Sequence, residues 1–289
     1  MNVVPQIVAS INEIRKTVTD PNLEARIQRA LETKVSGFVE QNRSIDLILP
    51  GFPAKSPDIK KDVFGPHVDR GEEIAVATLN GLCAHIGTLY KQGAHVTICS
   101  DGRIFSNELG IPDRDVDLYH NGLRELAKQA PHLRFVRLDD TFGKGTADQL
   151  RARFLARYAL LKEEYAEFAL TDTQAQASVA FFTKLFGKKQ KERALEVSRR
   201  SVAYYAMMDD VYRHHIRLSI HPQIPDVTPI SINLVSPFDG TLTPWRSVLV
   251  QTSQGNRLML KADAEKQNYE LIYKDGRPYC FMESQKQVG

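Results

Sequence analysis

Residues 94–113 have the sequence AHVTICSDGRIFSNELGIPD, and this stretch decides the expected fold. Its first part, Ala94 to Cys99, is a short apolar run of the kind found in strands buried on both faces of a parallel sheet. The residues Ser100–Arg103 end this run and open a loop that is expected to reach Pro112, before a helix that begins near Asp113. In open α/β sheets, ligands bind just beyond the carboxyl ends of the strands. The stretch therefore places a carboxylate, a guanidinium and hydroxyl groups where such a fold has its binding site.

On both sides of this stretch, the sequence alternates between strand and helix patterns. Apolar runs predict strands at 45–49 and 133–138, and helical spacing of apolar residues predicts helices at about 72–91 and 113–130. The loop at 50–71 is rich in Pro and Gly and much longer than the roughly 4–6 residues usual in compact domains, which indicates a functional loop. Because parallel strands end at the same edge of a sheet, the loops that follow the three strands are expected to meet there.

The rest of the chain adds helices before this core and a mixture of helices and strands after it. Two packing helices are expected, one at 6–18 and one that starts at Asp20 as N-cap and ends near Phe38. Residues 146–214 follow a helical pattern throughout, and a strand is expected at 216–220. Short β segments, which form an antiparallel or mixed extension of the sheet, are expected at 229–235, 247–252, 257–261, 269–274 and 278–283.

Length and composition fit one sizeable globular domain. The chain has 289 residues, of which 42% are hydrophobic, so a substantial core can form. We therefore expect a single α/β domain with parallel core strands, a helical insertion and a C-terminal antiparallel β extension. Its parts are N-terminal helices at 1–44, a β-α-β-α-β core at 45–145, a helical segment at 146–214 and a C-terminal β-rich part at 215–289.

Charge and cysteine content argue against several classes of protein. The 38 Lys and Arg against 35 Asp and Glu give a net charge of +3, which is too balanced to predict a nucleic-acid or membrane partner. A basic run at Lys188–Arg193 has no aromatic interleaving and is interpreted as a solvated helix start. Cys83, Cys99 and Cys280 are far apart, so we interpret them as buried thiols in a reducing compartment. The sequence has no signal-peptide core and no 18-residue apolar run, which favours the cytoplasm.

The long loop after the first core strand carries Lys55 within the segment FPAKSP. A lysine at a strand edge can hold a phosphate as a point charge. The alternative is a solvated polar loop, in which Lys55 lies with Lys60, Lys61, Asp69 and Glu72. The sequence favours this alternative for Lys60 and Lys61, and it leaves both interpretations open for Lys55.

The segment Ser100–Arg103 gives the strongest local signal of a site. Arg103 can bind a phosphate or a carboxylate through two parallel hydrogen bonds. Asp101 can orient an amine or move a proton, and Gly102 lets the backbone approach a ligand closely. Ser106 adds a hydroxyl in the same stretch. The alternative is a turn that is held by an internal pair between Asp101 and Arg103.

Two other segments carry cations that can complete an anion site. Lys144 lies in Gly143–Thr146, which precedes a helix but lacks the full GxxxxGK[ST] pattern, so a turn with an N-cap is the alternative. Arg217 and Ser219 share one face of the expected strand, and His221 lies one step further along that face. The alternative for this strand is a half-exposed element with its polar residues outward.

Residue chemistry alone thus leads to an α/β protein with a cationic site. HExxH, GxSxG and GxGxxG are absent, which disfavours metal, serine-hydrolase and dinucleotide chemistry.

Several separated segments, however, resemble one family. From about residue 45 to about residue 250, the segments LPGFPAKSP, GEEIAVATLNGL, SDGRIFSNELGIPD, SRRSVAYYAM, IRLSIHP and TPW occur in this order and resemble the isonitrile (isocyanide) synthases of the pyoverdine/dityrosine biosynthesis family.

The resemblance implies a Rossmann-like, three-layer fold that needs neither a nucleotide cofactor nor a metal. It also implies a reaction of the carbon–carbon lyase type between an aromatic amino acid, tyrosine or tryptophan, and the co-substrate ribulose 5-phosphate. The amine condenses with the sugar ketone, the sugar skeleton fragments, and one sugar carbon stays as the isonitrile carbon. A relative in the family gives an N-formyl tyrosine instead, and family members often pass their product to a downstream non-haem iron oxygenase.

Roles for individual residues follow from the resemblance together with their chemistry. The proton-transfer candidates are Asp101, His221 and Lys55. The candidates for binding phosphate or substrate are Arg103, Ser106, Arg217, Lys144 and Arg246, and those for an aromatic pocket are Phe105, Tyr204, Tyr205 and Trp245. In the family pattern TPW is followed by His, and Arg246 stands there in this chain; an imidazole can shuttle protons near neutral pH and an arginine cannot. Three functions stay open: an isonitrile synthase, a related enzyme that stops at the formamide, and a non-catalytic sugar-phosphate or amino-acid binding protein.

Overall fold

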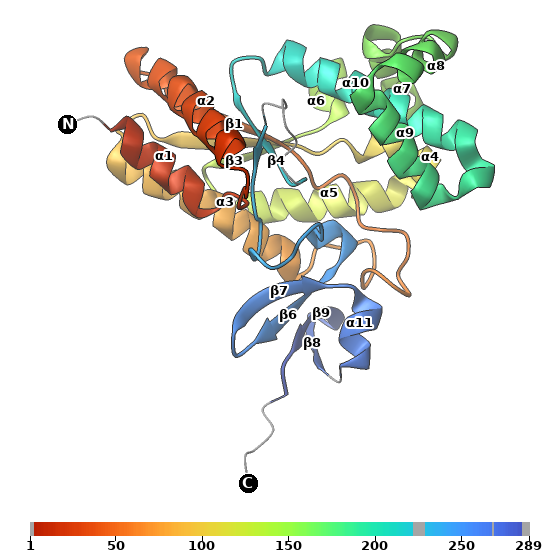
Figure 1. Cartoon of the computed structure of the whole chain (residues 1–289). Coiled ribbons are helices and arrows are strands. Elements are labelled where there is room, and N and C mark those ends of the chain that lie inside the picture. Colours follow the sequence, from red (N-terminus) through yellow and green to blue (C-terminus); the bar gives the residue numbers. More distant parts are fainter. Residues whose placement is uncertain (1–2, 222–228, 268, 285–289) are drawn as a thin grey trace. The chain divides into compact units, whose positions relative to one another are not determined.

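The computed structural model describes residues 3–221, 229–267 and 269–284, and the chain forms two compact units (Figure 1). Unit 1 is drawn from the ranges Met1–Ser100, Arg114–Val136 and His215–Gly289, and unit 2 from Asp101–Asp113 and Arg137–His214. The chain therefore passes from unit 1 into unit 2 directly after Ser100. Pro222, which closes the IRLSIHP segment, lies outside the described residues.

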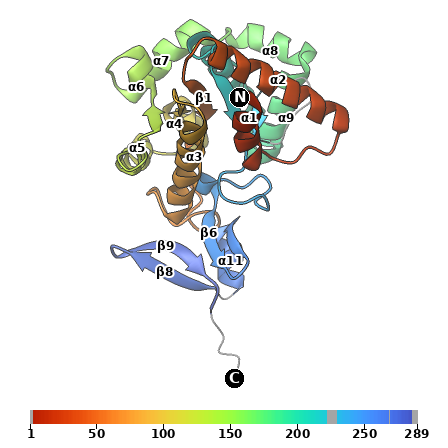
Figure 2. The ribbon, with the colours of Figure 1, turned by 90° about the vertical axis from the view of Figure 1, so that its left-hand side faces the viewer.

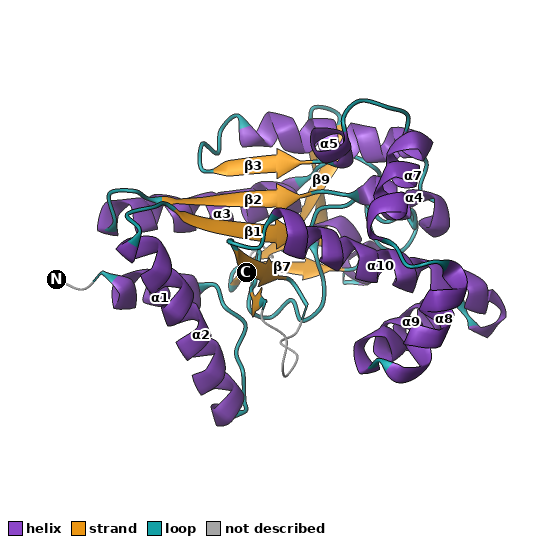
Figure 3. Ribbon diagram, turned by 90° about the horizontal axis from the view of Figure 1, so that it is seen from above, coloured by secondary structure: helices purple, strands orange, loops and turns teal. Residues whose placement is uncertain are grey.

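Unit 1 is built on a five-stranded parallel sheet, and Figure 3 shows three of its strands pointing the same way. The strands are β1 (Ile45–Pro50), β2 (Ala94–Cys99), β3 (Leu133–Val136), β4 (Ile216–Ser219) and β5 (Ile230–Ser231), in the order β3-β2-β1-β4-β5. The predicted parallel core is confirmed, although the third strand ends two residues earlier than expected. Strand order reverses between β1 and β4, and in such sheets the ligand crevice lies outside the carboxyl ends of the strands at this point.

Helices cover this sheet where amphipathic patterns predicted them. They are α1 (Val4–Glu13), α2 (Pro21–Glu40), α3 (Arg70–Leu89) and α5 (Asp113–Ala127). The carboxylate of Asp20 accepts hydrogen bonds from the first backbone amides of α2, at 2.9 Å from Asn22 N, so the predicted N-cap is confirmed. The first helix is shorter than expected because it ends at Glu13, and the following residues pair with the segment after β5.

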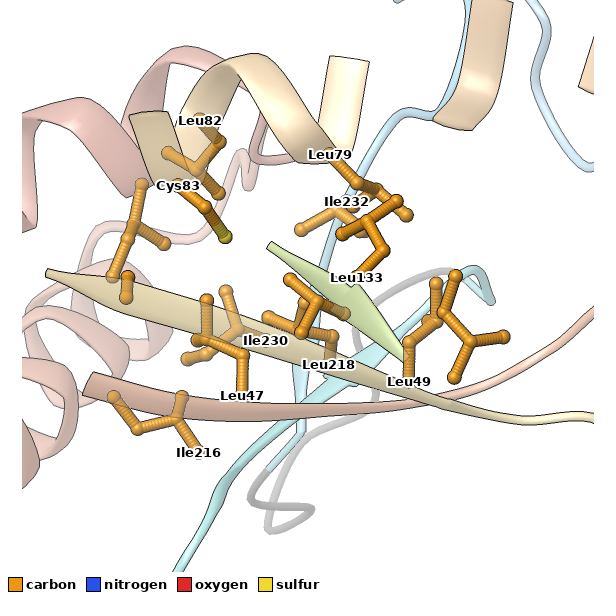
Figure 4. Close-up of a cluster of buried hydrophobic side chains, with 14 of the residues drawn as sticks. Leu47, Leu49, Leu79, Leu82, Cys83, Leu133, Ile216, Leu218, Ile230 and Ile232 are labelled. Carbon is orange, nitrogen blue, oxygen red and sulfur yellow. The ribbon is translucent and has the colours of Figure 1, made fainter. Parts of the chain in front are cut away.

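The main core lies where α1, α2, α3 and α5 pack on the parallel sheet. Figure 4 shows Leu79, Leu82 and Cys83 of α3 above strand side chains that include Leu47 and Leu49. These side chains are buried, and complete burial of one such aliphatic residue stabilises a fold by about 1.5–3 kcal/mol. Burial alternates along β4, so Arg217 and Ser219 lie on the face opposite to the buried Ile216 and Leu218, as the sequence predicted. All three cysteines are buried free thiols, which also agrees with the sequence.

The C-terminal strands form a sheet of their own, and this corrects the expected extension of the first sheet. They are β6 (Val248–Thr252), β7 (Gly255–Met259), β8 (Glu270–Lys274) and β9 (Arg277–Met282), in the order β7-β6-β9-β8, with α11 (Lys261–Lys266) between β7 and β8 (Figure 2). Pairing is antiparallel except between β6 and β9. Ile74 of α3 packs against the buried Leu249 and Leu258, so this sheet has its own apolar contact with α3. Among the described residues after β4, β5 alone joins the parallel sheet, so the segment predicted as a strand at 229–235 contributes two residues to it.

The regular secondary structure of unit 2 in its described residues is helical. Its elements are α4 (Gly102–Leu109), α6 (Leu138–Phe142), α7 (Ala147–Tyr158), α8 (Lys162–Thr171), α9 (Thr173–Phe186), η1 (Lys188–Gln190) and α10 (Lys191–Val211). Helix α4 corrects the loop expected at 100–112. Gly110 ends α4 in the left-handed region, with φ of 69°, and its amide donates to the carbonyl of Ser106, a geometry that glycine adopts without strain. Across both units, no helix in the described ranges has the length and apolar character of a membrane span.

Candidate functional site

The carboxyl end of β1 is marked by an unusual backbone conformation. Phe52, two residues beyond the strand, is fully buried and has a φ of 53°, a region that residues with bulky side chains seldom occupy. Its carbonyl accepts the hydroxyl proton of Ser100, which follows β2. Its ring packs against Trp245 with centroids 4.9 Å apart. Strained residues of this kind persist where several contacts fix them, and they are frequent near functional sites.

Ser100 also contacts a buried histidine that the sequence analysis did not single out. The Oγ of Ser100 lies 2.7 Å from Nε2 of His120 on α5. Because Ser100 gives its proton to the carbonyl of Phe52, His120 must be the donor in this contact. The imidazole therefore holds the hydroxyl in place and does not remove its proton. This geometry differs from that of a serine nucleophile, in which the histidine accepts the hydroxyl proton.

Lys55 lies in a buried cluster and not in a solvated loop. Its side chain is almost completely buried, and the residue is 3% exposed. Nζ contacts Asp69 Oδ2 at 2.7 Å, Glu72 Oε2 at 2.8 Å and the carbonyl of Pro244 at 2.9 Å. Tyr119 completes the cluster because its hydroxyl donates to the other Glu72 oxygen at 2.9 Å. The three protons of the ammonium thus face three acceptors.

The same two carboxylates start helix α3. Asp69 is the N-cap and accepts from Gly71 N at 2.9 Å, while Glu72 accepts from Asp69 N at 2.9 Å, which is the reciprocal pattern of a capping box. Each carboxylate therefore serves both the helix terminus and the ammonium. This double use explains why the loop from β1 returns to the end of α3 and buries Lys55 there.

The charges in this cluster do not cancel, because one ammonium faces two carboxylates. Burial raises the pKa of Asp69 to about 7, Lys55 opposes the rise, and the charge of Glu72 adds to it. Burial by itself lowers the pKa of Lys55, but Asp69 and Glu72 reverse that effect and raise it. We conclude that Lys55 stays charged and that Asp69 gains or loses a proton near neutral pH.

Lys55 and its neighbour Ser56 also hold a turn from a distant part of the chain. The carbonyl of Pro244 accepts from Lys55, and the carbonyl of Trp245 accepts from Ser56 N at 2.8 Å. Both acceptors belong to the 3-10 turn η2 (Pro244–Arg246). Trp245 is 6% exposed and belongs to the main core, so it does not line an open aromatic pocket in unit 1. Arg246, in contrast, is exposed at the tip of this turn.

The carboxyl end of β4 gathers cations that are not buried. Arg217 is half-buried on the polar face of the strand, and Ser219 Oγ accepts from the amide of His221 at 3.1 Å. Lys16, which the sequence analysis did not identify, donates from Nζ to the carbonyl of Ile220 at 2.7 Å. Desolvation by the surrounding protein lowers the pKa of His221, and the charges of Lys16 and Arg246 lower it further. Part of the residue is nevertheless exposed to solvent. The imidazole of His221 is therefore neutral near pH 7 and able to accept a proton.

In unit 2, the SDGR stretch leads into a network of arginines and carboxylates. Ser106 is fully buried; its hydroxyl donates to Asp113 at 2.7 Å and lies 3.1 Å from Arg151. Arg151 also contacts the carbonyl of Arg103 at 2.8 Å, and it pairs with Asp113 at 3.1 Å and Asp148 at 2.7 Å. Ser106 thus takes part in a network within the protein that fixes α4 against α7.

The charged residues predicted in unit 2 have different exposures. Asp101 is buried, Arg103 is half-buried, and Lys144 is exposed in the turn before α7. Burial raises the pKa of Asp113, but the hydrogen bonds from Arg151 and Ser106 and the charge of Arg103 outweigh it, so the pKa is lowered. Arg103 thus lies near at least one ionised carboxylate.

Two more features of unit 2 complete its description. Thr146 accepts from Gln149 N at 3.3 Å, which confirms the N-cap that the sequence offered as the alternative to a phosphate loop. The rings of Phe105 and Tyr204 lie edge to face with centroids 6.2 Å apart, and Tyr204 and Tyr205 are 6.2 Å apart. Tyr205 is the exposed member of these three aromatic residues, which were candidates for a substrate pocket.

Each unit therefore unites only part of the predicted site. Unit 1 holds Lys55, Arg217, His221 and Arg246, and unit 2 holds Asp101, Arg103, Ser106 and Lys144. The residues that sequence reasoning missed are His120 and Lys16. Both are partners of residues far along the chain, and a single sequence contains no periodic or motif signal for such contacts.

Comparison with known proteins provides independent information about the chain. A family model described as pyoverdine/dityrosine biosynthesis protein matches residues 35–167 and 156–272. The chain is 33% identical over 266 residues to L-tryptophan isonitrile synthase AmbI2 of Fischerella ambigua. This alignment covers 86% of this chain and 80% of that protein. It is 31% identical over 288 residues to L-tyrosine isonitrile synthase of Pseudomonas aeruginosa, across 92% of this chain and 88% of that protein.

A solved structure shows the same similarity in three dimensions. The crystal structure of the PvcA protein from Pseudomonas aeruginosa matches with a TM-score of 0.88 and 28% sequence identity, and the match covers 98% of this chain and 100% of that chain. The match includes nearly all of the polypeptide, so the fold of this chain is that of PvcA.

Proposed function

The chain belongs to the pyoverdine/dityrosine biosynthesis protein family, and on this premise we propose that it is an isonitrile synthase acting on the amino group of tyrosine or tryptophan. One observation carries the proposal: relatives named L-tryptophan and L-tyrosine isonitrile synthases align with 86% and 92% of the chain at 33% and 31% identity. A similarity that covers both units supports a shared reaction and not only a shared sheet.

We further propose that ribulose 5-phosphate supplies the isonitrile carbon and that no metal or organic cofactor takes part. The amine condenses with the ketone of the sugar, and one sugar carbon stays on nitrogen when the sugar skeleton fragments. Such a reaction needs proton transfers to and from nitrogen and oxygen, together with cations that hold a phosphate. The residues named from the sequence have these chemical properties.

In unit 1, His221 is the proposed base. An amino group must lose a proton before it can attack a ketone, and a neutral imidazole can accept it. The lowered pKa of His221 supports this role. Arg217 and Arg246 are the proposed cations for the phosphate. Lys55 is proposed as a residue that positions η2. Its ammonium already contacts three groups of the protein, which favours this role over direct binding of a phosphate.

In unit 2, Asp101 is the proposed acid–base group, and the proposed anion-binding residues are Arg103 and Lys144. Ser106 acts through Asp113 and Arg151, because its hydroxyl is buried between them. We propose that the isonitrile product is released to a downstream non-haem iron oxygenase.

The test is a mass-resolved incubation of the purified protein with tyrosine or tryptophan and uniformly 13C-labelled ribulose 5-phosphate. A product that is one carbon heavier and two hydrogens lighter than the amino acid, with that carbon labelled, would establish isonitrile synthesis, the amino acid and the carbon donor together. A labelled formamide that forms without prior isonitrile would indicate the related N-formylating enzyme. If ribulose 5-phosphate binds but neither product forms, the chain is a binding protein.

Matched variants connect the activity to individual residues. His221→Ala should lower turnover at least about tenfold, because proton transfer by a positioned group typically contributes on the order of a hundredfold or more. Arg103→Ala should lower kcat/KM at least about tenfold, because a hydrogen bond to a charged group typically contributes about 1.5–3 kcal/mol. His85→Ala and Arg114→Ala are the controls, since both residues are exposed and lie on helices α3 and α5. Near-wild-type turnover in His221→Ala and Arg103→Ala would remove both residues from the proposed mechanism.

A further inference from the structure

A narrow cavity lies at the carboxyl end of β4, next to the point where strand order reverses. Its interior has a volume of about 10 Å3, and it is lined in part by Lys16, Ile220, Asp239, Gly240 and Thr243. A cavity of about 10–15 Å3 holds one water-sized group, so this one can admit a single oxygen of a ligand while the rest of the ligand lies outside. All of these residues belong to unit 1.

Lys16 is held in this cavity by the main chain. Residues 15 and 16 pair with the end of β5 and the residue that follows it, because Lys16 N donates to Ser231 O at 2.8 Å and Arg15 forms an antiparallel bridge with Ile232. The ammonium then donates to the carbonyls of Ile220 at 2.7 Å and Gly240 at 2.8 Å. An ammonium has three donors, and these two contacts orient the group without neutralising its charge.

Thr243 provides the observation that points to a ligand. The residue is 4% exposed, and its hydroxyl has no hydrogen-bond partner among the described residues. A buried hydroxyl without a partner is energetically costly, so such groups are rare unless a water or a ligand completes them. Thr243 lines the same cavity as Lys16, so a donor hydroxyl and a charged ammonium border one space.

One ammonium and one carboxylate, those of Lys16 and Asp239, line this space, and Arg246 is a second cation near His221. Asp239 is the one acid that lines the cavity in the described part of the chain, and its two oxygens accept from the amides of Ser236 at 2.8 Å and Leu258 at 2.6 Å. Asp239 thus connects its own loop to β7 through these two hydrogen bonds. Arg246 lies three residues after Thr243 in the same turn, and the amide of Arg246 donates to the Thr243 carbonyl at 2.9 Å.

We propose that Lys16, Thr243 and Arg246 form an oxyanion-binding site for a substrate of the reaction. The two cations supply charge, and the threonine hydroxyl supplies a directed donor inside the cavity. Naming the oxyanion rests on the proposed function, which offers two sources: the phosphate of the sugar and the carboxylate of the amino acid. Both present planar or tetrahedral arrays of acceptors that such donors recognise.

Direct binding to the full chain tests the site without any turnover. Inorganic phosphate, ribulose 5-phosphate and tyrosine are titrated separately into the wild-type protein and into Lys16→Met. We expect one of the two substrates to lose at least about tenfold in affinity, and the substrate that does so identifies the source of the oxyanion. A parallel loss for inorganic phosphate indicates the sugar phosphate. Lys91→Met is the matched control, because this exposed lysine precedes β2 and lies toward the opposite edge of the sheet.

Thr243→Val separates binding from structure. Valine has the shape of threonine without the hydroxyl, so the apo protein should melt at the same temperature or higher, while affinity for the same substrate falls about threefold or more. A lower melting temperature would show that the hydroxyl has a structural partner, and that result overturns the proposal. Unchanged affinity in Lys16→Met, Thr243→Val and Arg246→Gln also overturns it. If the wild-type protein binds phosphate through Lys16 but forms no isonitrile, the oxyanion site stands and the proposed function fails.

Discussion

The carboxyl ends of β1 and β4 each present a lysine, but Lys55 and Lys16 have opposite surroundings. Lys55 is enclosed by two carboxylates and a carbonyl, so its charge is used within the protein. Lys16 is held by two carbonyls, which orient an ammonium without cancelling its charge. A lysine near a ligand crevice is therefore not by itself evidence for an anion site. The charge of its immediate partners decides between a structural and a ligand-binding role.

The largest effect expected from this comparison is the loss of the buried ammonium. Lys55→Met leaves Asp69 and Glu72 without their counter-ion, and breaking a buried pair in this way typically costs about 3–5 kcal/mol. We expect the free energy of unfolding, measured with urea, to fall by that amount. Lys60→Met is the control, because Lys60 is exposed in the same loop and should change stability by less than about 0.5 kcal/mol. Full stability of Lys55→Met together with lost turnover would instead make Lys55 a catalytic residue.

The second effect concerns how the Lys55 cluster responds to pH. Asp69 has a pKa of about 7 in the folded protein and a usual value of 3.8. Its raised pKa contributes stability that is complete below the unfolded value and is lost as pH rises through 7. The stability of the wild type relative to Asp69→Asn should therefore fall by about 3–4 kcal/mol between pH 4 and pH 8.

Urea unfolding of both proteins across this pH range measures that difference directly. A difference that stays constant with pH would mean that Asp69 remains ionised throughout, and that one ammonium is sufficient for both carboxylates. We expect no such pH dependence from the hydrogen bonds of Lys16, because their acceptors are carbonyls that do not titrate.

The third effect is the smaller structural contribution of Lys16. Lys16→Met removes two charge-assisted hydrogen bonds from a half-buried side chain, so we expect a loss of about 1–2 kcal/mol in unfolding free energy. Lys16→Arg, which keeps the charge and the donors, should recover most of it. A loss as large as that of Lys55→Met would contradict the distinction between the two lysines and would make Lys16 a structural residue of the same kind.

Periodicity and position explain which parts of the fold could be predicted. The strand at 94–99 was located to the residue, because a buried parallel strand is a continuous apolar run with polar ends. The N-cap at Asp20 could also be predicted, because its signal lies in Asp20 and the proline that follows it. Helix α4 differs from the predicted loop because the polar SDGR motif is typical of a loop, although a glycine followed closely by Pro112, as at Gly110, is also a known helix stop.

The surroundings of the candidate residues could not be predicted in this way. Lys55 was recognised as a candidate, but its burial depends on Pro244, 189 residues away. Lys16 escaped notice because its partners lie 204 and 224 residues away, in loops that have no periodic pattern. A single sequence identifies residues that are able to do chemistry, whereas tertiary contacts decide whether their charges are already satisfied.

The smallest expected effect on stability is that of Arg246, and it sharpens the comparison most. The side chain is exposed at the tip of a turn whose backbone is fixed by Lys55 and Ser56, so Arg246→Gln should change unfolding free energy by less than about 0.5 kcal/mol. The same variant should raise KM for the substrate whose affinity depends on Lys16, with a smaller effect on kcat. Lys55→Met should show the reverse pattern, with a large loss of stability. A destabilised Arg246→Gln with unchanged KM would place the function of this turn in folding, as for Lys55, and would leave the end of β4 without a cation for the substrate.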